Sequence, residues 1–167
     1  MFLRVVTKMS RWDGSKPVNR PGAKVCGDAI TDLKTSDNML SIWMADNDEQ
    51  IEESVAVIAL GRNKLDKVCY ILLDNEELDR INLLLEENMG QCKPVINEDV
   101  LKRHRDVIEL DSTQLECLSA YMLDQVQKSN CSFKDIEQLK KIIERMIDDK
   151  KVDPDKINDK IKKDLGL

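Results

Sequence analysis

The sequence predicts an α/β domain with a small, partly parallel sheet of three or four strands, covered by helices and followed by a C-terminal helical extension. Two apolar segments, 39–45 and 67–73, are each followed directly by a segment with helical periodicity. Strands and helices that alternate with short joints are typical of βαβ units, whose two strands run parallel. Beyond them the chain changes to densely charged helical segments. We therefore predict an α/β domain over 1–128 and a helical extension over 129–167.

The N-terminal part predicts two strands, a long loop and a buried helix. Residues 2–7 are rich in β-branched side chains and predict the first strand. Residues 10–38 contain Trp-Asp-Gly and Pro-Val-Asn-Arg-Pro-Gly, which are turn signals, and predict a long basic loop with one or two helical turns. Segment 39–45 is the second strand. Segment 49–61 is apolar on nearly every side, which indicates a helix that is mostly buried.

The middle of the chain continues the alternation. Segment 67–73 predicts an apolar strand, and 75–88 predicts a helix with leucine and isoleucine on one face. A short helix over 98–105 and a short strand over 107–110 follow. The periodicity of 114–128 then predicts an amphipathic helix that covers the sheet.

Two helices are predicted in the extension. Ser132, with Asp135 three residues later, has the pattern of a capping box, and Asp153-Pro154 has the residues preferred at a helix start. Each helix carries a narrow apolar stripe flanked by charge, which favours packing on a partner helix and association over folding. We predict a protein interface, toward another protein or a second copy of this chain, formed by Ile136, Leu139, Ile143, Met146, Ile157, Ile161 and Leu165.

Composition excludes several classes of protein. The 167 residues are 41% hydrophobic, enough for a core, and 35% charged, which indicates a strongly ionic surface. No apolar run approaches the roughly 18 residues of a transmembrane helix, so no membrane partner is expected. The five cysteines are odd in number and lack C-x-x-C spacing. Since no signal peptide is recognised either, we expect free thiols and a cytoplasmic protein.

Charge is unevenly distributed along the acidic chain. Residues 1–27 carry six basic side chains and one acidic one, whereas residues 28–131 carry ten basic and twenty-two acidic ones. The basic segment either folds onto the acidic body or contacts an anionic partner. Since Trp12 lies among the basic residues, nucleic-acid binding by stacking and phosphate contact is an alternative, disfavoured by the acidic chain and its few aromatics. The predicted contact residues are Arg4, Lys8, Arg11, Trp12, Lys16, Arg20 and Lys24.

An aspartate follows three of the predicted strands and precedes a helix: Asp46, Asp74 and Asp111. An acidic residue at this place caps the helix and complements its dipole, which is the interpretation that we favour. If the three carboxylates converged at one edge of the sheet, they would instead suit Mg²⁺. The alternative function is then an Mg²⁺-dependent phosphoryl-transfer or nuclease-type enzyme.

No catalytic residues are assigned. The chain has no phosphate-loop or dinucleotide motif, and its one histidine, His104, is interpreted as a solvated residue at a helix end. Asp32 and Lys34, with Asp28 upstream, form a loose nuclease-like pattern that occurs by chance in a chain this charged. We therefore predict a non-enzymatic protein-interaction or regulatory subunit of a cytoplasmic assembly. It needs no cofactor, and Mg²⁺ enters under the enzyme alternative only.

Overall fold

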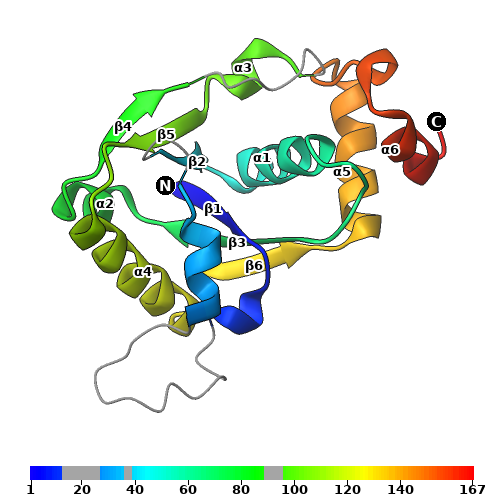
Figure 1. The fold of residues 1–167 in the computed structure, drawn as a ribbon. Helices are drawn as coiled ribbons and strands as arrows, with labels where there is room; N and C mark the ends of the chain where they lie inside the picture. The colour runs from blue at the N-terminus through cyan, green and yellow to red at the C-terminus, as the bar shows by residue number, and fades with distance from the viewer. Residues whose placement is uncertain (13–26, 36–38, 89–95) are drawn as a thin grey trace.

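A computed structural model describes residues 1–12, 27–35, 39–88 and 96–167. The fold is α/β, with a six-stranded antiparallel sheet in the order β4-β5-β2-β1-β3-β6 (Figure 1). The strands are β1 (Phe2–Val6), β2 (Leu40–Met44), β3 (Val68–Leu73), β4 (Leu84–Glu87), β5 (His104–Ile108) and β6 (Cys131–Lys134). The α-helices are α1 (Asp48–Leu60), α2 (Asn75–Arg80), α3 (Glu98–Leu101), α4 (Ser112–Gln127), α5 (Ile136–Asp148) and α6 (Asp159–Leu165). The described residues also form three 3₁₀ helices: η1 (Met9–Arg11), η2 (Gly27–Leu33) and η3 (Pro154–Lys156).

The prediction of a small, partly parallel sheet is wrong. The strand–helix–strand unit β2-α1-β3 exists, and its two strands do run in the same direction, but β1 lies between them. β1 pairs antiparallel with β2 at Phe2 and Leu3, and with β3 along its whole length. Because β1 separates β2 from β3, every described ladder of the sheet is antiparallel. The local pattern of strand and helix could not show that a third strand lies between the two.

Two of the six strands, β4 and β6, lie in segments that were predicted to be helical, and β5 begins two residues inside the helix predicted over 98–105. The helix predicted over 75–88 ends early, because Asn82 adopts a left-handed backbone (φ 56°) and the chain turns back as β4. Ser132 lies inside β6 and opens no helix. The N-cap of α5 is Asp135, which forms a capping box with Gln138.

Helices cover both faces of the sheet, and each face has its own hydrophobic core. On one face, side chains of α1, α3, α5 and α6 pack against Leu3 and Tyr70. On the other, η2, α2 and α4 pack against Phe2, Ile42 and Ile71 (Figure 1). Within the described residues, no helix is both long and apolar enough to cross a membrane.

The C-terminal segment is part of the domain, so the predicted helical extension is also wrong. β6 forms one edge of the sheet, and α5 packs on α1. Five of the seven predicted interface side chains are buried in the first core, and Leu165 packs against it: the buried ones are Leu139, Ile143, Met146, Ile157 and Ile161. Ile136, 40% exposed, is the remaining one. The apolar stripe of α5 therefore packs within this chain.

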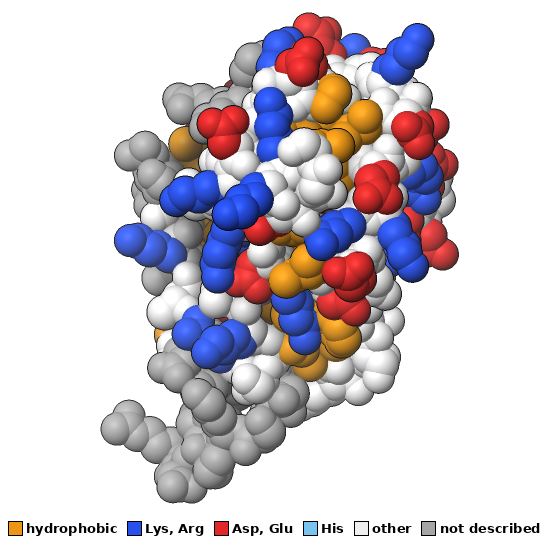
Figure 2. Space-filling view, turned by 90° about the vertical axis from the view of Figure 1, so that its right-hand side faces the viewer, with side chains coloured by type: hydrophobic (Ala, Val, Ile, Leu, Met, Phe, Trp, Pro, Cys, Tyr) orange, Lys and Arg blue, Asp and Glu red, His pale blue; other side chains and the backbone are white. Residues whose placement is uncertain are grey.

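Ion pairs reinforce the packing of α5 on α1. Glu52 accepts from Lys134 at 2.6 Å and from Arg145 at 3.1 Å, so it joins α1 to β6 and α5. The buried Glu53 accepts from Arg103 and Lys151, both at 2.6 Å. Figure 2 shows acidic and basic side chains interspersed on this side of the molecule, with hydrophobic side chains between them. The acids of α1 thus tie α5 and β6 to the rest of the domain.

A core role for α5 predicts a contrast between two isoleucines of one helix. Ile143→Ala removes a fully buried side chain and should lower the free energy of unfolding by about 2–5 kcal/mol. Ile136→Ala changes an exposed residue and should cost less than about 1 kcal/mol. Urea unfolding followed by circular dichroism measures both values. Equal, small effects would show that α5 is dispensable for folding.

Candidate functional site

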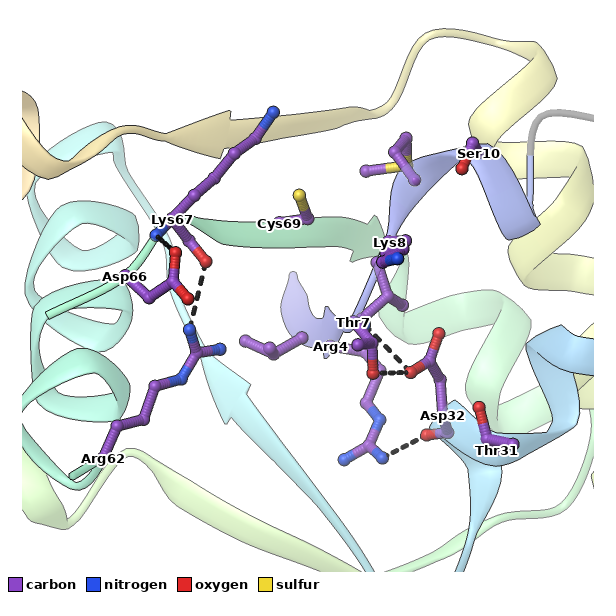
Figure 3. A pocket seen from close by; sticks show the side chains of 13 residues that line it. Arg4, Thr7, Lys8, Ser10, Thr31, Asp32, Arg62, Asp66, Lys67 and Cys69 are labelled. Carbon is purple, nitrogen blue, oxygen red and sulfur yellow. Dashed lines mark hydrogen bonds between the residues drawn. The ribbon is translucent and has the colours of Figure 1, made fainter. Parts of the chain in front are cut away.

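An open pocket of about 820 Å³ lies beside the C-terminal end of β1. Its walls come from β1 and η1, from η2, from the start of β3 and from the connection between α1 and β3 (Figure 3). The charged side chains that line it are Arg4, Lys8, Asp32, Arg62, Asp66 and Lys67. Segments far apart in the sequence thus place four cations and two carboxylates around one hollow.

The buried carboxylate of Asp32 organises one wall of this pocket. Asp32 is 5% exposed, and its Oδ1 accepts hydrogen bonds from the backbone N–H of Thr7, at 2.9 Å, and from the Thr7 hydroxyl. Its Oδ2 accepts from Nε1 of Trp12 at 2.9 Å. Neutral donors therefore solvate the buried charge, and the same bonds fasten η2 to the end of β1.

Arg4 lies where β1 and β2 separate. The ladder between these strands ends at Leu3. Beyond it, the Arg4 guanidinium lies beside the backbone of β2. It donates to the carbonyl oxygen of Ser41 at 2.6 Å and to that of Asp32. Its Nε is buried and has no hydrogen-bond partner among the described residues. Burial lowers the pKa of Arg4 to about 10, against the opposing effect of the Asp32 charge. Arg4 therefore stays charged at neutral pH, bound by carbonyl oxygens.

Among the described residues, no ion pair joins the other cations of the pocket to a carboxylate. Lys8 is exposed, and its amine makes no hydrogen bond or ion pair with a described residue. Arg62 donates to the carbonyl of Lys67 at 3.0 Å, and the Lys67 ammonium lies 3.6 Å from the centre of the Phe133 ring. Asp66 accepts from the backbone N–H of Lys67 at 2.8 Å. The pocket is therefore a site of positive potential that a bound anion would neutralise.

The seven residues predicted to contact an anionic partner are found in different environments. Arg4 and Lys8 line the pocket, and Arg11 donates to the Thr31 hydroxyl at 2.8 Å beside it. Trp12 is fully buried and bound to Asp32, so its ring cannot stack on a ligand. Three of the seven lie outside the described residues: Lys16, Arg20 and Lys24.

The three aspartates predicted at helix starts act locally. Asp74 caps α2, its Oδ1 accepting from the Glu76 N–H at 2.8 Å. Asp111 caps α4 in a capping box with Gln114. The cap of α1 is Asn47, whereas Asp46 lies 4.0 Å from the amino group of Met1.

The direction of the strands keeps these aspartates apart. Asp46 follows β2 and Asp74 follows β3. These two strands run in the same direction, so their C-terminal ends lie on the same side of the sheet. Asp111 follows β5, which runs antiparallel to β2 and ends beside its start. Among the described residues, no three His, Cys, Asp or Glu side chains are grouped so that they could hold a metal ion.

A second polar cluster surrounds His104, which lies on β5 and not at a helix end. Its Nδ1 contacts the carbonyl of Asn88, and its Nε2 lies 3.8 Å from Asp106. The Ser41 hydroxyl donates to Asp106 at 3.0 Å. Because the serine points to the carboxylate and not to the histidine, the three residues do not form a nucleophile–base pair.

The pocket contains residues that the sequence did not single out, namely Arg62, Asp66 and Lys67. No motif links them to Arg4 or Lys8, since they become neighbours only when β3 pairs with β1. No protein-family model, curated protein or solved structure matches the chain significantly, so its function has to be inferred from this geometry.

The capping role of Asp74 can be tested against Asp46, which caps no helix. Asp74→Ala should lower the free energy of unfolding by about 1 kcal/mol, because the start of α2 loses its acceptor. Asp46→Ala should cost a few tenths of a kcal/mol at most, since its contact is exposed. Thermal unfolding with and without Mg²⁺ completes the test. A stabilisation by Mg²⁺ that disappears in Asp46→Ala would support the metal-dependent alternative instead.

Proposed function

We propose that this chain is a non-enzymatic binding module whose pocket beside β1 receives a phosphoryl group of a partner molecule. The supporting observation is the charge of the pocket. Four cations face two carboxylates, which leaves two positive charges uncompensated. A phosphoryl group carries about −1.5 to −2 at neutral pH and so matches this excess, whereas one carboxylate would neutralise half of it.

The donors of the pocket suit the same ligand. Arg62 supplies a planar guanidinium group, which matches phosphate oxygens in pairs, and Lys8 adds an exposed ammonium. Arg4 uses two of its nitrogens on carbonyl oxygens, which hold its charge in place without cancelling it. We expect a dianion in this hollow to make charge-assisted contacts with Lys8 and Arg62 and to be attracted by the fixed charge of Arg4.

Binding accounts for the pocket better than catalysis does, because its acids are already engaged. Asp32 is surrounded by donors, and Asp66 accepts from the backbone of Lys67. Asp32 is therefore not available to a ligand as a general base, and the exposed Asp66 carboxylate also forms an ion pair with Lys64 at 3.5 Å. We retain a regulatory or interaction subunit as the proposed role, with the cytoplasm as its compartment, because the described cysteines are free thiols.

The competing functions have less support. The aspartates that an Mg²⁺-dependent enzyme would use follow strands of opposite direction. Nucleic-acid binding would favour cations spread along an outward face with an accessible aromatic platform. Here the cations converge on one hollow and Trp12 is buried. We expect no DNA or RNA binding at physiological salt.

Reversal of a single charge tests the proposal. Lys8→Glu should weaken the binding of O-phospho-L-threonine at least about tenfold, because an acceptor replaces a donor in the pocket. Lys160→Glu makes the same change of net charge at an exposed position of α6 and should leave affinity within about twofold. Isothermal titration calorimetry at constant ionic strength measures both. No binding by the natural chain, or equal weakening in the two variants, would refute the phosphoryl site.

A further inference from the structure

The β6 strand is one of the two edges of the sheet, and half of its backbone groups point outward. The Leu72 N–H donates to the Asn130 carbonyl, and Tyr70 pairs with Ser132 in the same register. Hydrogen-bonded and non-hydrogen-bonded pairs alternate along an antiparallel ladder. The N–H and C=O groups of Cys131 and Phe133 therefore face away from β3, and no described residue binds them.

The side chains of β6 leave this edge accessible. Phe133 is 48% exposed, and Ser132 is exposed as well. Charged side chains commonly protect an edge strand from pairing. In β6 the one charged residue is Lys134, and its ammonium is held 2.6 Å from Glu52 of α1. The nearby Lys67 ammonium rests on the Phe133 ring. Lys134 is thus engaged by α1, and Lys67 by the Phe133 ring.

We propose that a second copy of this chain pairs antiparallel on the β6 edge, with Ser132 opposite its own counterpart. The two sheets then continue into one across a twofold axis. In this register Cys131 of each copy lies opposite Phe133 of the other, and these outward-facing residues exchange both of their backbone hydrogen bonds. Lys134 lies opposite Asn130.

Self-complementarity favours a second copy over an unrelated strand. Within the ladder, the register places a neutral serine on the axis, an apolar ring opposite a thiol, and an ammonium opposite a neutral amide, so no two β6 residues of like charge are paired. The other edge, β4, differs in this respect. Its exposed Glu86 and Glu87 would line a self-paired ladder with carboxylates. A ladder as short as β6 buries little area, so the dimer should depend on protein concentration.

An engineered cross-link tests both the dimer and its register. Opposed residues of a non-hydrogen-bonded pair have Cα atoms about 4.5 Å apart, which is within disulfide range. Ser132→Cys should therefore form a covalent dimer under mild oxidation, in a Cys117→Ser background that removes the cysteine that is exposed among the described ones. Ser112→Cys, exposed at the start of α4, is the matched control and should cross-link at least about tenfold more slowly.

Two readouts make the outcome decisive. Peptide mapping should find the bond between the two copies of residue 132, and sedimentation of the natural chain should show a monomer–dimer equilibrium that Phe133→Pro shifts to monomer. A chain that stays monomeric at all concentrations, or a Ser132→Cys variant that cross-links no faster than the control, would overturn the proposal. Neither result depends on whether the pocket binds phosphate.

Discussion

The buried carboxylate of Asp32 is the interaction on which the described N-terminal part of the structure depends. It fixes η2 against the end of β1 through Thr7, and it satisfies the indole of the fully buried Trp12. Because all of its donors are neutral, its charge is not cancelled by a salt bridge. Arg4, which contacts the backbone of the same residue, keeps its own charge beside the pocket. The Asp32 carboxylate thus holds one wall of the pocket in place without forming a hydrogen bond to any of the four cations that line it.

This arrangement shows where the described basic residues of the N-terminal segment lie relative to the acidic part of the chain. The described basic residues of the segment are not spread over acidic surface. Arg4 and Lys8 join Arg62 and Lys67, which come from the body of the chain, around one hollow. The acids of α1 pair instead with basic residues of β6, α5 and neighbouring loops, which fastens the C-terminal part to the core. The acids of α1 therefore stabilise the fold, whereas these four cations surround the proposed binding site.

The sequence predicted local elements better than their arrangement. Runs of apolar or β-branched residues, together with helical periodicity, were sufficient to locate five elements: β1, β2, α1, β3 and α4. β4 and β6 were missed, since four residues are too few for a period to stand out beside good helix formers. The insertion of β1 between β2 and β3 left no local mark. Asp32 fell in a pattern that occurs by chance, and its importance arises from contacts with Thr7 and Trp12 that only the fold creates.

The phosphate affinity of an Asp32→Asn variant tests most directly whether this carboxylate builds the pocket. Asparagine keeps one acceptor oxygen and places its NH₂ donor against the donors of either Thr7 or Trp12, so η2 should loosen from β1. We predict that the variant, titrated with inorganic phosphate by calorimetry under conditions where circular dichroism shows it folded, binds more weakly than the natural chain. This weakening is expected even though the substitution removes a negative charge from the pocket wall. Tighter binding, as net charge alone would produce, would contradict the dependence of the site on Asp32.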